Sequence, residues 1–327
     1  MTANISTPIL LTGGNGFLGQ AICKVLSRQG AEVVCASRSN IDQPSVKHVP
    51  ISGIDAATDW TDALEKVRVV IHSAARVHVM NDSAADPLIE FRRVNVEGTL
   101  NLAKQAAAAG IRRFIFISSI KVNGEQTSLA IPFTSEDIPA PQDPYGVSKF
   151  EAEQGILLLA EQTGMEVVIV RPPLVYGPGV KANFASMMRW LYRGIPLPLG
   201  AINNKRSFVY IENLVSFIVS CIDHPDAANQ IFLASDDQDV STTELLKACA
   251  SALGVKSRLL PVPQGLLVAL VSAIGKNSVA QRLCGSLQLD ISKSKQLLGW
   301  TPPFSLQQGL DETAKWFIDT ESAKIQS

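Results

Sequence analysis

One segment of the sequence pairs a phenol with an ammonium group. Tyr145 stands four residues before Lys149, a spacing that places both side chains on one face of a helix, and Asp143 and Pro144 mark the start of a helix expected to reach Gln162. A free tyrosine has a pKa of about 10, but a nearby ammonium favours the phenolate. The pair suits a reaction in which a proton moves on a carbinol oxygen while a hydride moves on its carbon.

A second segment has the pattern of a phosphate-binding turn. Gly13, Gly16 and Gly19 follow the apolar stretch Ile9–Leu11 and precede a helix expected to begin near Phe17. Glycines at this spacing permit a tight turn and close approach of the backbone to a pyrophosphate, which the amino terminus of the helix attracts. The pattern predicts a dinucleotide site.

An apolar stretch that ends at Ser118 and Ser119 lies between these two segments. The order and distances of the three features resemble those of the extended short-chain dehydrogenase/reductase family, in its NAD-dependent epimerase/dehydratase branch. The resemblance covers almost the whole chain. It implies a catalytic triad of Ser119, Tyr145 and Lys149, in which Ser119 orients the reacting oxygen and Lys149 also holds the nicotinamide ribose.

The same resemblance implies a set of cofactor contacts along the carboxyl ends of the expected strands. At the adenine, Ile54 is an alternative to Asp55. The implied contacts are Gly13, Gly16, Phe17, Leu18, Gly19, Ser37, Arg38, Asp55, Ala74, Ala75, Asn95, Ile117, Tyr145, Lys149 and Pro172.

The end of the second expected strand bears on the choice of cofactor. Relatives that bind NAD carry an acidic residue there for the ribose 2′-hydroxyl, whereas this chain has Ser37 followed by Arg38. Serine removes a charge that would repel a 2′-phosphate, and arginine can donate two N–H bonds to that phosphate. The sequence favours NADP(H), with NAD(H) as the other option and adenine stacking as the other role for Arg38.

Residues in the second half of the chain match substrate contacts of UDP-sugar epimerases. Arg206 matches the arginine that clamps the diphosphate, and Asn183 and Leu199 fall where relatives contact the nucleotide. Lys121, two residues after Ser119, either bonds a sugar hydroxyl or N-acetyl group or is a solvated loop lysine. The expected partner is a UDP-sugar.

Departures from the family pattern narrow the activity. Ile120 and Lys121 replace the Asp-Glu pair of 4,6-dehydratases, which argues against water elimination, and Leu174 replaces an asparagine that epimerases use on the substrate. Residues 75–82 and 121–124 are similar to bacterial surface-polysaccharide reductases that form UDP-N-acetylquinovosamine from UDP-4-keto-6-deoxy-N-acetylglucosamine. We therefore predict a C4 oxidoreductase of this 4-ketoreductase type. The alternative is a UDP-glucose or UDP-N-acetylglucosamine 4-epimerase, and a cofactor-sensing scaffold without activity is a remote one.

Strands and helices alternate from the start of the chain, which predicts an α/β fold with a Rossmann-type, doubly wound parallel sheet. We expect residues 1–176 and 207–237 to form the nucleotide-binding domain, and residues 177–206 and 238–327 to form a smaller α/β substrate-binding domain. The expected strands of the sheet are Ile9–Leu11, Glu32–Ala36, Val67–His72, Arg113–Ser118 and Val167–Arg171.

Composition argues against several other partners. The 327 residues carry a net charge of -1, which gives no electrostatic basis for binding nucleic acid. The five cysteines form no Cys-x-x-Cys motif, and the first residues lack a signal-peptide pattern, so we expect reduced thiols and a cytoplasmic location. The four histidines lack metal-ligand spacing, so no metal is expected.

The apolar stretch from Leu266 to Ile274 is the longest in the sequence. It is far shorter than the roughly 20 residues that a membrane-spanning helix needs, so no stable insertion is expected. We interpret this stretch as a helix in the protein core, and the alternative interpretation is a helix in weak contact with a membrane surface. The sequence leaves open whether the protein forms a homodimer.

Overall fold

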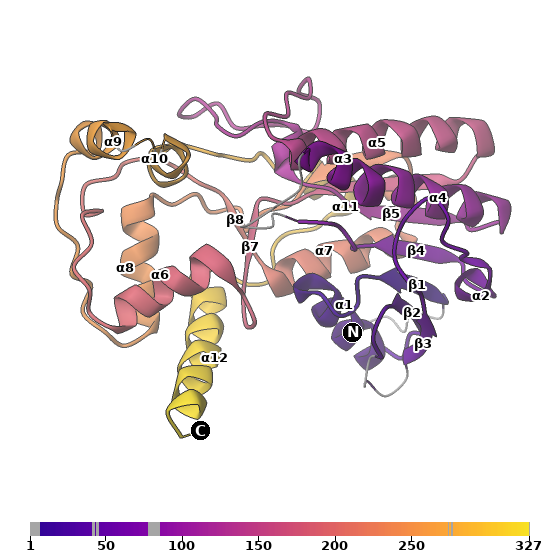
Figure 1. Cartoon of the computed structure of the whole chain (residues 1–327), viewed down its shortest axis with the longest axis horizontal. Coiled ribbons are helices and arrows are strands. Elements are labelled where there is room, and N and C mark those ends of the chain that lie inside the picture. Colours follow the sequence, from indigo (N-terminus) through magenta and orange to yellow (C-terminus); the bar gives the residue numbers. More distant parts are fainter. Residues whose placement is uncertain are drawn as a thin grey trace.

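A seven-stranded parallel sheet forms the larger part of the protein (Figure 1). The structure is a computed structural model that describes residues 7–40, 43, 46–77, 86–273, 275 and 277–326. The strand order β3-β2-β1-β4-β5-β6-β9 reverses between β1 and β4, which confirms the predicted doubly wound sheet and places a crevice at their carboxyl ends. The strands are β1 Ile9–Thr12, β2 Val33–Ser37, β3 Val46–Pro50, β4 Val69–His72, β5 Arg113–Ile117, β6 Glu166–Arg171 and β9 Gln230–Leu233.

Helices cover both faces of this sheet, which explains why its central strands are apolar throughout. On one face lie α1 (Phe17–Arg28) and α7 (Ile211–Asp223), and on the other lie α4 (Thr99–Ala108) and α5 (Pro144–Thr163). Successive residues of each central strand therefore enter two different apolar layers. The residues that directly follow the strand ends are therefore attached to a sheet that is packed on both faces.

The helix α5 begins and ends at residues whose types favour those positions. The Asp143 carboxylate accepts a hydrogen bond of 2.6 Å from the Gly146 N–H, and Pro144 occupies the first position of the helix. Gly164 follows the last turn with a φ of 76°, in the left-handed region that glycine adopts at low cost. The helix places the fully buried Lys149 in its second turn.

A smaller part lies beside the sheet (Figure 1). Two short strands, β7 (Leu174–Tyr176) and β8 (Phe208–Tyr210), pair in parallel at its base, and its helices enclose an apolar core of their own. The other elements are α2 Thr61–Leu64, α3 Pro87–Arg92, a π-helix Arg93–Gly98, short 3-10 turns at Ile120–Val122 and Pro225–Ala227, α6 Ala182–Tyr192, α8 Thr242–Ala252, α9 Gln264–Ala273, α10 Asn277–Cys284, α11 Ser292–Leu298 and α12 Leu306–Gln326.

The apolar helix α9 is not enclosed on all sides. Leu267 is buried in the core of the smaller part, whereas Leu266 and Leu270 are more than half exposed. Ile274, the end of the predicted apolar stretch, lies outside the described residues. Among the residues that the structure describes, no helix has the length and hydropathy needed to cross a bilayer.

Candidate active site

The turn between β1 and α1 leaves no room for side chains. Gly13 has a φ of 75°, and a Cβ on it would lie 2.8 Å from the backbone nitrogen of Ala74. A Cβ on Gly19 would lie 2.0 Å from the Gly13 carbonyl oxygen. Gly16 caps α1 without any side-chain hydrogen bond, so the first N–H groups of the helix, which include those of Phe17 and Leu18, are not capped by a side chain. This turn fits a pyrophosphate group.

The end of β2 lies beside this turn and carries no carboxylate. The Asn15 amide joins the two by donating a hydrogen bond of 3.0 Å to the Ser39 carbonyl. The Ser37 hydroxyl donates to the same carbonyl at 2.7 Å, and the Arg38 side chain is exposed. The predicted 2′-phosphate contact at Arg38 therefore stands at the rim of the site.

Asn95, which the π-helix places in the interior, binds the backbone of Arg76 just after β4. The Asn95 side-chain oxygen accepts a hydrogen bond of 2.8 Å from the Arg76 N–H. Its amide nitrogen donates to the Arg76 carbonyl at 3.0 Å and to the Ser148 hydroxyl at 3.1 Å. These bonds hold Ala74 and Ala75 beside the glycine turn. The Asn95 side chain thus links the residues after β4 to Ser148 on α5.

The predicted adenine contact at Asp55 is engaged in a turn of its own. The Asp55 carboxylate accepts hydrogen bonds from the Ala57 N–H at 3.0 Å and the Thr58 hydroxyl at 3.1 Å. Its neighbour Ile54 packs closely on the π-helix, because a Cβ on Gly98 would lie 2.7 Å from the Ile54 side chain. The structure places both residues next to the helix that holds Asn95.

Three segments meet around the predicted triad. Ser119 caps the short turn after β5, and the Ile120 N–H donates a hydrogen bond of 3.0 Å to the Pro172 carbonyl beyond β6. The Lys149 ammonium donates 2.8 Å to the Ile117 carbonyl. The loops after β5 and β6 are thus tied together, and α5 is tied to β5, so Ser119 and Tyr145 lie on adjoining segments.

Burial dominates the electrostatics of the predicted pair on α5. Burial lowers the pKa of the Lys149 ammonium to about 7, and Glu153 opposes this shift. Burial also raises the pKa of the Tyr145 phenol, and the Asp143 carboxylate raises it further. The Lys149 ammonium is turned to the Ile117 carbonyl and the Phe116 ring, 4.4 Å from the ring centroid.

A buried ion pair stands behind the triad, and we did not predict it. Arg171 donates to the Glu153 carboxylate through two nitrogens, at 3.0 and 2.5 Å, and to the Asn123 side chain at 2.9 Å. The Ser118 hydroxyl donates to the same carboxylate. The sequence signal was available, because Glu153 follows Lys149 by four residues and shares its helix face.

Lys121 lies between Ser119 and the start of α5. Its ammonium forms an ion pair with the Asp143 carboxylate and lies 3.4 Å from a Glu125 oxygen. The Lys121 ammonium is therefore already paired with carboxylates and is not a free solvated lysine. Whether it also bonds a sugar stays a prediction.

On the substrate side the structure adds a second arginine. One Arg206 nitrogen donates 2.9 Å to the Gly285 carbonyl, and burial, then the nearby Arg282, lowers the pKa of Arg206. The positive charge of Arg282 acts on Arg206, and an anion near both groups would offset their repulsion. Arg282 lies 76 positions away in the sequence, and no local pattern pointed to it.

The other predicted substrate residues differ in exposure. Asn183 is exposed at the start of α6, and Leu174 is 44% exposed on β7. Leu199 is buried in the core of the smaller part, and its carbonyl accepts a hydrogen bond of 2.6 Å from Thr243. The Leu199 side chain is therefore part of that core, and its contact with a substrate stays a prediction.

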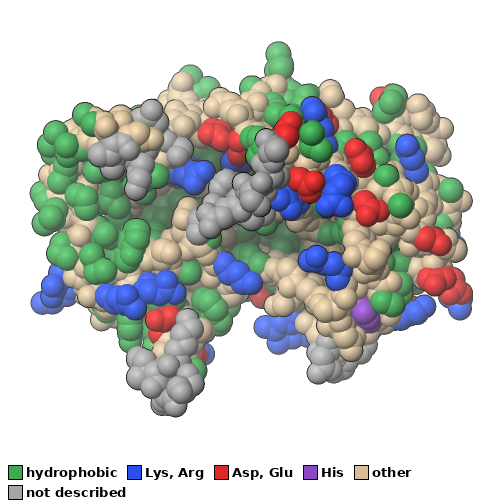
Figure 2. Space-filling view, viewed as in Figure 1, with side chains coloured by type: hydrophobic (Ala, Val, Ile, Leu, Met, Phe, Trp, Pro, Cys, Tyr) green, Lys and Arg blue, Asp and Glu red, His purple; other side chains and the backbone are tan. Residues whose placement is uncertain are grey.

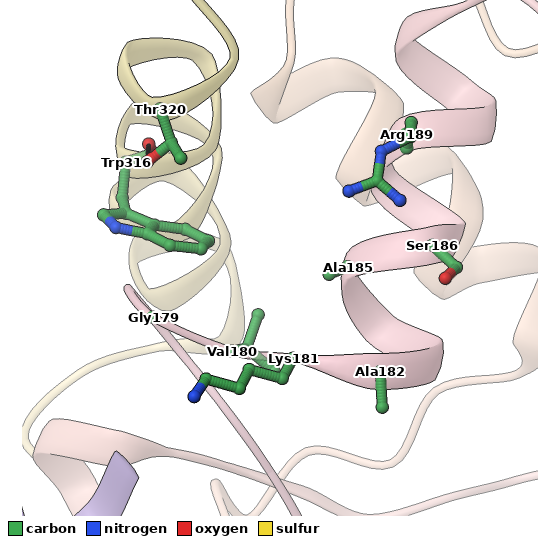
Figure 3. Close-up of a pocket in the computed structure, with 9 residues that line it drawn as sticks. All are labelled: Gly179, Val180, Lys181, Ala182, Ala185, Ser186, Arg189, Trp316 and Thr320. Atoms are coloured by element: carbon green, nitrogen blue, oxygen red, sulfur yellow. Dashed lines mark hydrogen bonds between the residues drawn. The ribbon is translucent and has the colours of Figure 1, made fainter. Parts of the chain in front are cut away.

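The space-filling view shows the surface hollowed between the sheet and the smaller part, with Lys and Arg side chains gathered around this hollow (Figure 2). A separate cavity of about 370 Å³ lies between α6 and α12, lined by Arg189, Trp316 and Thr320 among others (Figure 3). None of the predicted site residues lines that cavity. Within the described part of the chain, no group of three or more His, Cys, Asp or Glu residues is placed to hold a metal ion.

Comparisons with known proteins agree with this geometry. The profile of the NAD dependent epimerase/dehydratase family matches residues 9–234. The chain is 50% identical over 316 residues to a UDP-glucose 4-epimerase of Vibrio cholerae, with 96% of each chain covered. Among solved structures, the UDP-N-acetylglucosamine 4-epimerase from Bacillus cereus superposes with a TM-score of 0.79 at 23% identity, covering 96% of this chain and 100% of that one.

A second solved structure, UDP-glucuronic acid 4-epimerase from Bacillus cereus in complex with NAD, has a TM-score of 0.78 at 20% identity, covering 96% of this chain and 99% of that one. At these identities the two structures show the shared fold. The family profile spans more than half of the chain, and the Vibrio cholerae relative spans nearly all of it. The protein is therefore an enzyme that belongs to the NAD dependent epimerase/dehydratase family.

Proposed function

We propose that the protein is a UDP-sugar 4-epimerase. The observation that carries this proposal is the 50% identity, over 96% of both chains, to a UDP-glucose 4-epimerase. The activity was the alternative in the sequence analysis, behind the 4-ketoreductase, and the comparisons favour it. The site supports it with a serine, a tyrosine and a lysine on adjoining segments beside a glycine turn that fits a dinucleotide.

Epimerisation at C4 needs a proton and a hydride to leave the same carbinol group and return with the opposite configuration. Tyr145 takes the proton from the C4 hydroxyl and later restores it, while Ser119 hydrogen-bonds that oxygen and orients it. Lys149, with a pKa near 7, shifts toward the ammonium when an anion approaches and then stabilises the phenolate. When bound, NAD supplies reversible hydride transfer at C4.

The diphosphate of the substrate is assigned to the two arginines of the smaller part. Arg206 and Arg282 lie close enough to lower the pKa of Arg206, and a diphosphate offers oxygens to both guanidinium groups. Residues 177–206 and 238–327 then form the substrate-binding part, and residues 1–176 with 207–237 form the dinucleotide-binding part. In this assignment Asn183 and the segment that contains Leu199 lie on the side of the nucleotide.

The cofactor of an epimerase is regenerated in each cycle, which suits tightly held NAD. The absence of an acidic residue at Ser37 and the exposed Arg38 beside it still favour recognition of a 2′-phosphate. This feature supports the second candidate, a 4-ketoreductase of UDP-4-keto-6-deoxy-N-acetylglucosamine that consumes NADPH in each turnover. We rank it second because the full-length relative is an epimerase.

The test is a product analysis with purified enzyme. UDP-glucose, UDP-galactose, UDP-N-acetylglucosamine and UDP-N-acetylgalactosamine are incubated with NAD or NADP in deuterated water, and products are identified by NMR. An epimerase gives a mixture of C4 epimers without deuterium at C4, because the hydride returns from the cofactor. Stoichiometric oxidation of NADPH with the 4-keto-6-deoxy sugar, and no interconversion of the four UDP-sugars, would establish the reductase instead.

A further inference from the structure

An ion pair joins the two segments that carry Ser119 and Tyr145. The Lys121 ammonium pairs with one oxygen of Asp143, whose other oxygen accepts a hydrogen bond of 2.6 Å from the Gly146 N–H and so caps α5. The Lys121 N–H lies 3.3 Å from the Ser119 hydroxyl oxygen, which caps the turn after β5. A single lysine therefore connects the turn of one catalytic candidate to the helix cap of the other.

The backbones of the two segments are packed closely at the same place. A Cβ on Gly146 would lie 2.9 Å from the Lys121 carbonyl oxygen. At the next residue, Val122, the carbonyl accepts a hydrogen bond of 2.9 Å from the N–H of Ala140, which precedes α5. Any shift of Lys121 is therefore transmitted to the first turn of α5.

The Asp143 carboxylate disfavours the Tyr145 phenolate, since it raises the pKa of Tyr145 beyond the effect of burial. Two carboxylates of α5 have other partners, because Glu151 pairs with Arg92 and Glu153 pairs with Arg171. The titratable and charged groups that the structure places around the Tyr145 helix turn are Lys149, Glu151 and Glu153 on α5, Lys121 and Glu125 after β5, His72 and Arg76 at the end of β4, Arg92 on α3 and Arg171 on β6.

We propose that Lys121 is a positioning residue for Tyr145, because its ion pair with Asp143 fixes the distance between the two catalytic segments and offsets the negative charge of the helix cap. The inference rests on the proposed function in taking Tyr145 as the group that moves the proton. It gives Lys121 a role in the chemical step, whereas a sugar contact would give it a role in substrate affinity.

The test compares four single variants and one double variant of the NAD-loaded enzyme. Lys121→Met removes the ammonium and keeps the length of the side chain, and Lys121→Arg restores the charge. Asp143→Asn keeps a good helix cap without the charge. Glu125→Gln is the matched control, because it removes the other carboxylate beside Lys121 without touching α5.

Two readouts are measured for each variant. The first is the ultraviolet absorbance of tyrosinate as a function of pH, from which the titration of the same protein with Tyr145→Phe is subtracted. The chain has four tyrosines, so the contribution of one is measurable. The second is the pH dependence of kcat and KM with the preferred UDP-sugar.

We expect Lys121→Met to move the deprotonation of Tyr145, and the acid limb of kcat, to higher pH by about one unit, with KM little changed. Adding Asp143→Asn to Lys121→Met should reverse the shift, and Lys121→Arg and Glu125→Gln should titrate like the unmodified enzyme. An unmoved titration in Lys121→Met, or a raised KM with an unchanged pH profile, overturns the proposal. If the unmodified enzyme converts no UDP-sugar, the proposed function fails, and the tyrosinate titration still decides this inference.

Discussion

The buried pair of Glu153 and Arg171 yields a prediction about stability. Both side chains are 2% exposed, and Glu153→Gln leaves the Arg171 guanidinium without a counter-charge. Removing one partner of a buried ion pair costs about 3–5 kcal/mol, more than the roughly 1–3 kcal/mol of an unsatisfied neutral group. We expect the free energy of unfolding to fall by about 3–5 kcal/mol and the melting temperature by at least about 6 °C, at about 2 °C per kcal/mol.

The matched control is Glu151→Gln, which lies on the same helix and breaks an exposed pair with Arg92. It should cost less than about 1 kcal/mol, because solvent screens that pair. The double variant Glu153→Gln with Arg171→Met should recover most of the loss, since removal of both charges leaves neither one buried alone.

Urea unfolding followed by circular dichroism measures these differences. Equal midpoints for Glu153→Gln and Glu151→Gln would refute the reasoning, as would a double variant less stable than Glu153→Gln. The kinetics supply a second check. Glu153 raises the pKa of Lys149, so its loss should move the alkaline limb of kcat to lower pH.

Three further predictions concern chemistry, cofactor and acid stability. Tyr145→Phe should keep cofactor affinity, measured by titration, and lose at least about 100-fold in kcat, and near-normal turnover would contradict the mechanism. Arg38→Ala should weaken NADPH more than NADH by about 1.5–3 kcal/mol, whereas equal losses in calorimetry would exclude a 2′-phosphate contact. Burial lowers the pKa of His72 from 6.5 to about 3. The contribution of neutral His72 to the free energy of unfolding is therefore complete above pH 6.5 and is lost as the pH falls toward 3. Unfolding free energies should therefore drop by about 2 kcal/mol from pH 7.5 to 5, and His72→Gln should flatten this slope.

Local patterns sufficed to predict the sheet and the helix α5. Strand alternation, the glycine turn and the Asp143-Pro144 helix start all act within a few residues, so the sequence displays them directly. The placement of Tyr145 and Lys149 on one helix, four residues apart, follows from the sequence in the same way. These features could be predicted because their physical causes are short-range.

The contacts that shape the site are long-range, and the sequence did not reveal them. Lys121 meets a carboxylate 22 positions away at Asp143, so its loop pattern alone could not separate a solvated lysine from an engaged one. The proximity of Arg282 to Arg206 arises only when the smaller part folds. Asn95 and Asp55 were expected at the cofactor, and the structure shows that hydrogen bonds to the backbone already engage both side chains.

The pairing of β9 with β6 determines which truncated fragments and chimeras of this chain can fold. The edge of β6 stays open until Gln230–Leu233 arrives, nearly 60 residues after β6 ends, and the first segment of the smaller part lies in that interval. A fragment that stops before β9 therefore presents an unpaired, apolar strand edge, which invites aggregation. A chimera that exchanges the proposed substrate-binding part has to carry residues 177–206 and 238–327 together, because both segments contribute to one apolar core.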